Sequence, residues 1–367
     1  MKLAFAFLSL VSSAALAHNP GDPPHQQHCM GELKLEGGQA IRDFCISYVT
    51  HGTLNAAKSN AILMVTAISG NHHRIDYLIG PGRALDPSKY FVIATDAIGN
   101  GLTTSPSNSK SQPMMQFPRF NIRDMVASQQ HLVSEKFGIQ KLVTVIGASM
   151  GGMQALQWGV SHPDMTASLV PIIPLGRTPA WTTGVLEMTR QSIMADPKWK
   201  GGNYVRSDPP ELGMRLWAGW LSGVIVRTPA YQEFQYPNSQ DEIGFLKGVM
   251  DGGWKRIEAI DWVYQTWAYD AHNVGTTPGF NGDYHRALRS IKAKTLILAG
   301  TGDLLNPEYE AMEAAHYIPD VRYVAINERR PMGHVSGAGI SAPENELQNA
   351  EIAKFLASIP SGTSAPR

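Results

Sequence analysis

The sequence predicts an α/β protein in which helices cover both faces of a mostly parallel sheet and a helical segment interrupts the pattern. Short runs of apolar, often β-branched residues recur along the chain, and helical patterns separate them. Strands that alternate with helices form parallel sheets, because each connection returns the chain to the same end of the sheet. The expected strands are 61–66, 90–95, 143–148, 167–173, 293–300 and 321–326.

The beginning of the chain departs from this rhythm. Residues 31–48 alternate apolar and polar side chains around a Gly37-Gly38 turn, which predicts an antiparallel hairpin. Residues 18–30 contain several His and Pro and few apolar side chains, so we expect an extended arm outside the core. A metal-binding arm is the alternative, because three of its residues are histidines: His18, His25 and His28.

A long stretch, residues 176–285, has helical patterns and contains most of the tryptophans. Strand patterns are absent from it and resume afterwards, which predicts an insertion that covers the sheet as a lid; a second, independent domain is the alternative. The predicted organisation is a core of an α/β fold in 18–175, the lid in 176–285, a second core segment in 286–360 and a disordered tail in 361–367.

The first 17 residues combine one Lys, an apolar run and a terminal Ala15-Leu16-Ala17, which is the pattern of a secretory signal peptide. We expect cleavage after Ala17 and a secreted or periplasmic mature protein; a buried N-terminal helix is the alternative. No later stretch reaches the roughly 18 apolar residues of a transmembrane helix. Because disulfides persist in exported proteins, Cys29 and Cys45 are candidates for one disulfide, with two free thiols as the alternative.

The composition is that of a globular protein, with 43% hydrophobic residues in a chain of 367. Its 31 basic and 31 acidic residues balance one another. This balance argues against nucleic acid or an anionic membrane surface as a partner.

The most informative stretch is residues 143–158. A β-branched apolar run ends at Gly147-Ala148-Ser149-Met150-Gly151, and a helical pattern follows. Side chains at the two glycines would collide where strand and helix approach closely. A strand, a tight turn with serine and a helix resemble the nucleophile elbow of α/β-hydrolases, so Ser149 is the predicted nucleophile. A structural Gly-rich turn is the alternative.

A serine hydroxyl needs a base within hydrogen-bond reach, and the base needs a carboxylate to orient it. In the α/β-hydrolase fold these residues follow the order Ser, Asp or Glu, His. Asp303 comes just after the strand at 293–300, and His334 follows the last strand. We therefore predict Ser149, Asp303 and His334 as a catalytic triad. Taken singly, Asp303 also fits a helix cap and His334 a surface residue.

Two backbone N–H groups should form an oxyanion hole. One belongs to Met150, directly after the serine, and the other to Ile68, in the loop after the strand at 61–66. The other histidines are weaker candidates: His72 and His73 for substrate contact near that loop, His272 and His285 as pocket residues, and His162 and His316 without a catalytic role.

Several segments closely resemble homoserine O-acetyltransferases, which are α/β-hydrolases with a helical lid. The resemblance spans most of residues 31–340 and is carried by 66–70, 82–86, 90–93, 122–126, 147–158 and 195–204. It implies that the serine takes an acyl group from acetyl-CoA and passes it to the homoserine hydroxyl. It also implies that the triad and oxyanion donors are the residues predicted above.

Three departures from this family favour a hydrolase. The acetyltransferases follow the catalytic His with an Asp that helps to hold the substrate's amino group, whereas Val335 follows His334. Their Arg-Phe-Asp-Ala segment corresponds to Ala268-Tyr269-Asp270-Ala271, so we expect no Arg there for a substrate carboxylate. Export would also separate the protein from cytosolic acetyl-CoA and homoserine. The chain is identified as a member of the family's exported hydrolase branch.

We therefore predict an exported serine hydrolase that cleaves an ester or a related acyl bond through an acyl-enzyme on Ser149. An acyltransferase that passes the acyl group to an alcohol is the nearest alternative. A non-catalytic binding protein on the same fold is the second. The expected partner is a small-molecule acyl substrate, without a cofactor or a metal, and the chain could act as a monomer or as a homodimer.

Overall fold

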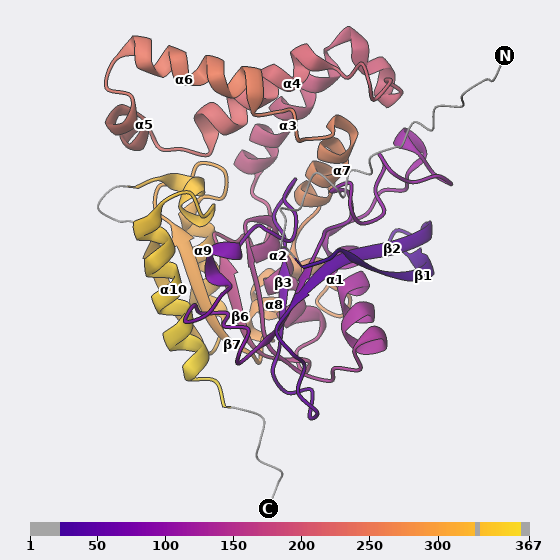
Figure 1. The fold of residues 1–367 in the computed structure, drawn as a ribbon, viewed down its shortest axis with the longest axis vertical. Coiled ribbons are helices and arrows are strands. Elements are labelled where there is room, and N and C mark those ends of the chain that lie inside the picture. Colours follow the sequence, from indigo (N-terminus) through magenta and orange to yellow (C-terminus); the bar gives the residue numbers. More distant parts are fainter. Residues whose placement is uncertain (1–22, 327–330, 361–367) are drawn as a thin grey trace, which may run out of the picture.

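The computed structural model of the protein describes residues 23–326 and 331–360. The predicted signal peptide (1–17), the first residues of the predicted arm and the predicted tail (361–367) lie outside the described residues. The described residues contain one sheet, helices on both of its faces and a further group of helices beyond one end of it (Figure 1). None of the helices in these ranges combines the length and the apolarity that crossing a bilayer requires.

The sheet has the strand order β1-β2-β4-β3-β5-β6-β7-β8. The strands are β1 (Gln26–Lys34), β2 (Ala40–His51), β3 (Ala61–Val65), β4 (Phe91–Thr95), β5 (Leu142–Ala148), β6 (Thr166–Ile172), β7 (Lys294–Gly300) and β8 (Val321–Ile326). The pairs β1–β2 and β2–β4 are antiparallel, and all other neighbours are parallel. The mostly parallel α/β fold that the sequence predicts is confirmed.

Strand β1 corrects the prediction of an extended arm up to residue 30. It begins at Gln26, which pairs with Tyr48 of β2. Most of its side chains are exposed or half-buried, because an edge strand that covers little core needs few apolar residues. Its polar composition therefore concealed a strand. Cys29 lies opposite Cys45 in the register of β1 and β2, and the two cysteines form a disulfide.

Helices cover both faces of the sheet because successive side chains of a strand point to opposite faces. In β3, Leu63 and Val65 belong to the core on one side, and Ile62 and Met64 belong to the core on the other. The first core also receives side chains from α1, α2, α8 and α9, and the second from α10. These helices are α1 (Ile122–His131), α2 (Met150–Ser161), α8 (Tyr284–Arg289), α9 (Glu308–Tyr317) and α10 (Ala342–Ala357).

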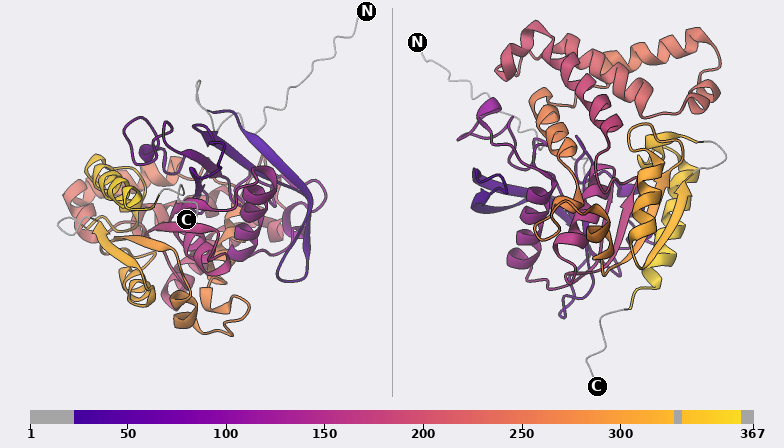
Figure 2. Two further views of the ribbon diagram at one scale, coloured as in Figure 1. Left: turned by 90° about the horizontal axis from the view of Figure 1, so that it is seen from below. Right: turned by 180° about the vertical axis from the view of Figure 1, so that it is seen from behind.

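Between β6 and α8 the chain forms a group of helices that stands beyond the carboxyl ends of the parallel strands (Figures 1 and 2). They are α3 (Ala180–Met194), α4 (Glu211–Ala218), α5 (Pro229–Gln235), α6 (Ser239–Gly252) and α7 (Ala259–Asp270). α4 packs against α3 and α6, while α7 packs against α3. These helices lie within the stretch predicted as a lid, and we use that name for residues 180–270. Its function as a cover stays a prediction.

Candidate active site

Ser149 lies at the sharp turn between β5 and α2. Its φ of 58° and ψ of −120° are rare for a residue with a side chain. Its N–H donates to Ile172 O (2.9 Å), which fixes the turn to the neighbouring strand. A Cβ on Gly147 would lie 2.5 Å from Val65 O, and a Cβ on Gly151 would lie 2.4 Å from the same oxygen. Glycine on both sides of the serine is therefore a steric requirement.

The structure brings the three predicted triad side chains into one hydrogen-bonded chain. His334 Nε2 lies 2.8 Å from Ser149 Oγ, and His334 Nδ1 lies 2.7 Å from Asp303 Oδ2. All three residues are buried, with exposed fractions of 1% for Ser149, 4% for Asp303 and 6% for His334. In this arrangement Nδ1–H donates to the carboxylate, so Nε2 carries the lone pair that faces the serine hydroxyl. The geometry is that of a base oriented by an acid and placed against a nucleophile.

The Asp303 carboxylate is held in this orientation by its own loop. Its Oδ1 accepts hydrogen bonds from the N–H groups of Leu305 and Asn306, each at 2.8 Å. Its Oδ2 is thereby left to His334. The next helix, α9, begins at Glu308 with Pro307 as its N-cap residue and has no side-chain cap, so Asp303 does not cap it. One carboxylate oxygen of Asp303 orders its own loop, while the other meets the imidazole.

The two predicted oxyanion donors lie at the ends of neighbouring strands. Met150 is the first residue of α2, and Ile68 lies in the loop after β3. In the hydrogen bonds of the described residues, neither N–H has a protein acceptor. The loop is held from the lid, since Ser69 N–H donates to Gln265 Oε1 (2.7 Å) and Gln265 Nε2 donates to Ile98 O (3.0 Å). Helix α7 therefore braces the loop that carries Ile68.

His72 lies buried beneath the loop that carries Ile68 and bonds to Asp96. This differs from the substrate contact that the sequence predicts for it. Its side chain is fully buried, and Nδ1 lies 3.1 Å from Asp96 Oδ2. Asp96 also accepts from Ser47 Oγ and from Asn100 Nδ2, which donates to Gly70 O as well. By donor type, Asp96 and His72 could bind a metal together with His25. Both carboxylate oxygens of Asp96 accept hydrogen bonds from protein donors, and these bonds join the loop after β3 to the loop after β4.

The other weaker histidine candidates also have structural contacts. His73 Nδ1 pairs with Asp76 Oδ2 at 2.6 Å. His272 is buried with Nε2 3.1 Å from Leu175 O, and burial lowers its pKa to about 3. His285 pairs with Glu313 between α8 and α9. None of these three lines the pocket described below.

The lid contains a buried arginine close to residues 268–271, the segment in which the sequence predicts no arginine. Arg190 of α3 is 3% exposed, and it pairs with Asp270 (2.6 Å) and with Glu187 (2.8 Å). The segment Ala268-Tyr269-Asp270-Ala271 therefore has a guanidinium beside it. Two protein carboxylates already neutralise this charge.

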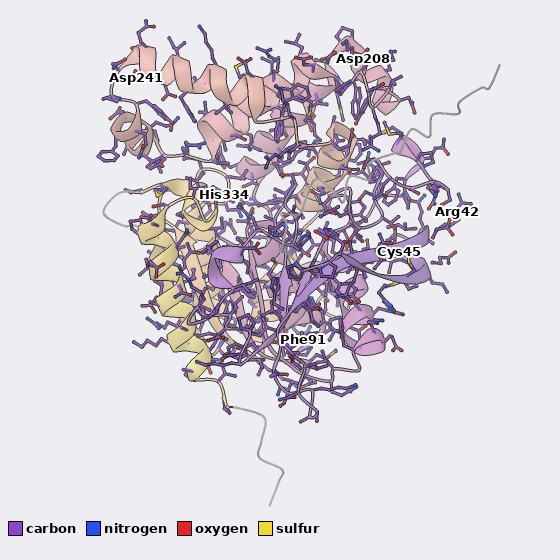
Figure 3. The ribbon with its side chains drawn as sticks, in the orientation of Figure 1. Arg42, Cys45, Phe91, Asp208, Asp241 and His334 are labelled. Atoms are coloured by element: carbon purple, nitrogen blue, oxygen red, sulfur yellow. A yellow bond between two sulfur atoms is a disulfide. The ribbon has the colours of Figure 1, made fainter. Side chains whose placement is uncertain are left out.

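The lid contacts the loop that carries His334. The N–H of Val335 donates to Val226 O at 3.1 Å, and Thr228 Oγ1 donates to Pro331 O. Val335 itself is buried. Figure 3 labels His334 at this junction, below the helices of the lid. The base of the candidate triad is thus held partly by the lid.

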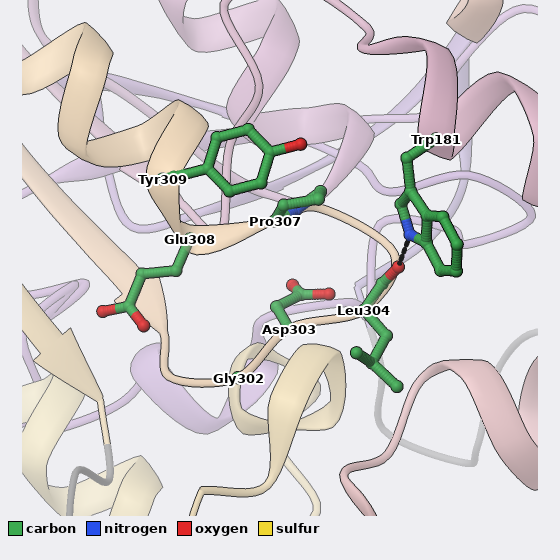
Figure 4. A pocket seen from close by; sticks show the side chains of 7 residues that line it. All are labelled: Trp181, Gly302, Asp303, Leu304, Pro307, Glu308 and Tyr309. Atoms are coloured by element: carbon green, nitrogen blue, oxygen red, sulfur yellow. Dashed lines mark hydrogen bonds between the residues drawn. The ribbon is translucent and has the colours of Figure 1, made fainter.

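A surface pocket of about 480 Å³ lies beside the loop of Asp303 (Figure 4). Trp181 Nε1 donates to Leu304 O at 2.6 Å, which ties α3 to this loop. The pocket is lined by Trp181, Gly302, Asp303, Leu304, Pro307, Glu308 and Tyr309. Ser149 and His334 are not among these residues, so the pocket is next to the candidate site and not at its nucleophile.

Two polar residues at the site were not singled out from the sequence. The buried Tyr269, at the end of α7, donates from its hydroxyl to Asn306 Oδ1 at 2.5 Å. Asn306 in turn follows Asp303 and bonds to its carboxylate. In the sequence, Tyr269 belongs only to the segment that corresponds to Arg-Phe-Asp-Ala of the acetyltransferases. Asn306 belongs only to the loop after Asp303. No local pattern predicts that Tyr269 of the lid meets the loop of Asp303.

Comparisons with known proteins identify the fold family of the chain. Residues 60–218 match the family model of the alpha/beta hydrolase fold. A homoserine O-acetyltransferase of Chlorobaculum parvum is 35% identical over 343 residues, which cover 89% of this chain and 92% of that protein. The solved structure of the acetyl esterase MekB has a TM-score of 0.84 and 30% identity, covering 91% of this chain and 97% of that one. An acetylester hydrolase from Corynebacterium glutamicum has a TM-score of 0.83 and 28% identity, with coverages of 91% and 96%. The chain belongs to the homoserine O-acetyltransferase-like family of α/β-hydrolase enzymes.

Proposed function

We propose that this protein is an exported serine hydrolase that cleaves an ester or a related acyl bond through an acyl-enzyme on Ser149. The observation that supports the proposal most directly is the hydrogen-bonded chain from Asp303 through His334 to Ser149. A serine hydroxyl becomes an effective nucleophile only when such a base takes its proton.

In the proposed reaction, Ser149 attacks the substrate carbonyl while His334 Nε2 takes the serine proton and then gives it to the leaving alcohol. Asp303 keeps the imidazole in place and stabilises its positive charge. The N–H groups of Met150 and Ile68 receive the oxyanion, and each such donor contributes about 3 kcal/mol in comparable sites. Water that His334 deprotonates then releases the acyl group.

Hydrolysis is favoured over acyl transfer because the site offers little to hold an amino acid. Val335 is apolar and buried where the acetyltransferases have a carboxylate, and Arg190 is already neutralised by protein carboxylates. The likeness to an acetyl esterase and an acetylester hydrolase supports a short acyl group. Acyl transfer to an alcohol is the second candidate, since the sequence relative at 35% identity is named a homoserine O-acetyltransferase.

The deciding experiment compares two activities of one preparation. We expect clear hydrolysis of p-nitrophenyl acetate and no homoserine-dependent release of CoA from acetyl-CoA. An unpaired substrate charge in a covered site costs several kcal/mol, so transfer should be slower by roughly a thousandfold or more. The measurement is p-nitrophenolate release beside free CoA release.

Ser149→Ala is the matched control for this experiment. It should retain the fold and lose ester turnover, and a fluorophosphonate should add once to the wild-type protein and not to the variant. Ester turnover that survives in Ser149→Ala would end the serine-hydrolase proposal. Homoserine-dependent CoA release faster than ester turnover would establish the acyltransferase instead.

Export is supported by two features of the N-terminal region. The first 17 residues have the pattern of a signal peptide. Cys29 and Cys45 form a disulfide, and such bonds persist mainly in oxidising compartments.

The proposal also includes a homodimer that forms through the lid. Leu212, Leu216, Trp220 and Val224 follow one another at intervals of four residues, and each is at least 40% exposed. This spacing places them on one face of the segment formed by α4 and the π-helix that continues it (Gly219–Ile225). A row of exposed apolar side chains is typical of an interface. Sedimentation velocity should give twice the mass of one chain, and Leu216→Glu should give a monomer. A wild-type protein that sediments as a monomer would contradict this assignment.

A further inference from the structure

Gln265 lies in α7, and its side chain joins the lid to the loop that carries the candidate oxyanion donor Ile68. The side chain is fully buried. Its Oε1 accepts from the Ser69 N–H at 2.7 Å, and its Nε2 donates to Ile98 O at 3.0 Å. A backbone N–H can only donate and a carbonyl oxygen can only accept, so these two partners fix which way the amide points. One side chain of the lid thus bridges the loop after β3 and the loop after β4.

The loop after β4 leaves room for this side chain. Gly99 follows Ile98 and has a φ of 83°. A Cβ on Gly99 would lie 2.9 Å from Gln265 Cγ, so a larger residue would displace the glutamine. Glycine also adopts a positive φ without steric cost. The glycine and the buried amide therefore belong to one contact between the lid and the core.

Residues 67–70 form the tight turn that presents the Ile68 N–H. The Gly70 N–H donates to Ala67 O at 3.0 Å, which closes the turn. A peptide group is planar, with its C=O and its N–H on opposite sides, so the direction of Ala67 O also sets the direction of the Ile68 N–H. The aim of this candidate oxyanion donor therefore depends on the conformation of the turn.

Ser69 makes the turn dependent on support from outside. Its φ of 52° is uncommon for a residue with a side chain and persists only where the surroundings hold it. In the hydrogen bonds of the described residues, the Ser69 hydroxyl has no partner, so its N–H bond to Gln265 is the contact that holds it. Asn100 supports the turn from the core by donating to Gly70 O at 3.1 Å. The support at Ser69 itself comes from the lid.

We propose that Gln265 is a positioning residue of the oxyanion hole, which keeps the Ile68 N–H in place by holding the Ser69 N–H. This inference rests on the proposed acyl-enzyme at Ser149. Formation and hydrolysis of that acyl-enzyme both pass through a tetrahedral oxyanion, so a displaced donor slows both steps. The lid thereby takes part in stabilising the transition state, through a side chain that acts on the turn and not on the substrate.

The test is steady-state hydrolysis of p-nitrophenyl acetate by Gln265→Met, which keeps the length of the side chain and removes both hydrogen bonds. We expect kcat to fall about ten- to a hundredfold, since removing an oxyanion donor outright costs roughly a hundred- to a thousandfold. KM should stay within about threefold, because the donor acts on the oxyanion and not on the bound ester.

A transition-state analogue gives a readout that reports on the oxyanion directly. Trifluoroacetophenone adds to a serine as a hemiketal whose oxygen is negatively charged. Its inhibition constant should rise in Gln265→Met by about the factor by which kcat/KM falls. A fall in kcat/KM with an unchanged inhibition constant would overturn the assignment.

Tyr264→Phe is the matched control, because it breaks a different bond between α7 and the core. Tyr264 is buried, and its hydroxyl donates to Phe117 O at 2.7 Å. This variant removes a lid contact without touching residues 67–70, so kcat and the inhibition constant should stay within about threefold of the wild type. An equal fall of kcat in both variants, or an unchanged kcat in Gln265→Met, would overturn the assignment.

A second substitution separates support of the turn from anchoring of the lid. Glycine adopts a positive φ readily, so Ser69→Gly should make the turn less dependent on Gln265. Added to Gln265→Met, it should restore kcat by at least about threefold. If it restores nothing, the lost activity does not come from the turn and the assignment is wrong.

Gln265→Asn keeps the test decisive if Gln265→Met does not fold. Its amide is one methylene too short to bridge both partners, so kcat should fall by at least about fivefold while KM changes little. An unchanged kcat in this variant would also overturn the assignment. A wild-type protein without Ser149-dependent release of p-nitrophenolate would overturn the proposed function itself, which is a separate outcome from an unchanged kcat in the Gln265 variants.

Discussion

Ser149 shows how strongly one residue's backbone conformation constrains its neighbours. Its positive φ is costly for a residue with a side chain, by roughly 1–3 kcal/mol, and persists only where the surroundings hold it. Here β5 and α2 hold it from both ends, and Gly147 and Gly151 leave room for Val65 O. The atoms that impose these requirements belong to other strands, but the residues that meet them, Gly147, Ser149 and Gly151, are close in sequence, so the turn could be predicted from their spacing.

At the same scale, we predict that Asp303→Asn lowers kcat by a factor on the order of 10⁴, as in serine proteases. The amide oxygen would take the place of Oδ1, since that position accepts two backbone N–H groups. The NH₂ group would then face His334 Nδ1 and force the tautomer that has its proton on Nε2. That imidazole cannot accept the serine proton. Steady-state kinetics measure the effect, with thermal unfolding as a check that the fold is retained.

A loss of less than about tenfold would show that another carboxylate is the partner of His334. Asp270→Asn serves as a comparison, because Asp270 pairs with Arg190 and not with an imidazole. It should leave the pH dependence of kcat unchanged even if it loosens the lid.

The local sequence predicts where some helices and strands begin but does not predict others. Helix α1 begins at a signal that its own sequence contains, because Asn121 accepts from Asp124 N–H and the Asp124 carboxylate accepts from Asn121 N–H. Strand β1 was missed over residues 26–30 because its pairing with β2 supplies the order that its own composition does not. A cap is a contact between near neighbours, whereas strand pairing joins separate segments.

Helix α7 has a buried acid that should make stability depend on pH. Asp261 is 3% exposed, and its carboxyl group contacts the N–H and hydroxyl of Ser107. Burial, with a smaller contribution from Glu258, raises the pKa of Asp261 to about 8, although the hydrogen bonds from Ser107 and the charge of Arg206 lower it. Between about pH 4 and about pH 8 the unfolded chain releases this proton while the folded protein keeps it. The group therefore lowers the free energy of unfolding as the pH rises.

We predict that Asp261→Asn removes this dependence. Its free energy of unfolding relative to the wild type should increase from pH 5 to pH 8 by more than about 1.4 kcal/mol, the equivalent of one pKa unit. Urea unfolding at the two pH values measures the difference. If both proteins respond equally to pH, Asp261 titrates normally in the folded protein and the prediction is wrong.

At the scale of the whole molecule, a disulfide joins β1, the edge strand of the sheet, to its neighbour β2. We predict that the exported protein begins at His18 and contains one disulfide, between Cys29 and Cys45. The bond spans 16 residues and should stabilise the fold by up to about 3 kcal/mol. Intact mass before and after reduction with alkylation measures the bond, and Cys29→Ser with Cys45→Ser measures its effect on unfolding. Two thiols that alkylate without reductant would refute it.

The sequence by itself determined the class of fold and the parts of the candidate site. Strand and helix periodicity, the glycines around Ser149 and the position of Asp303 after a strand all depend on residues near one another in the chain. The order in which Ser149, Asp303 and His334 occur in the chain allowed a triad to be predicted before their distances were known.

Only the tertiary structure decided what surrounds those parts. The contact of Tyr269 with Asn306, the pairing of Arg190 with Asp270 and the bond of His72 to Asp96 each join segments that are far apart in the sequence or fold back on one another. Such contacts leave no periodic pattern in the sequence, because each of them needs only one polar side chain from each of the two segments that it joins. Their partners are set by how the lid and the sheet pack together, and that packing is a property of the whole chain.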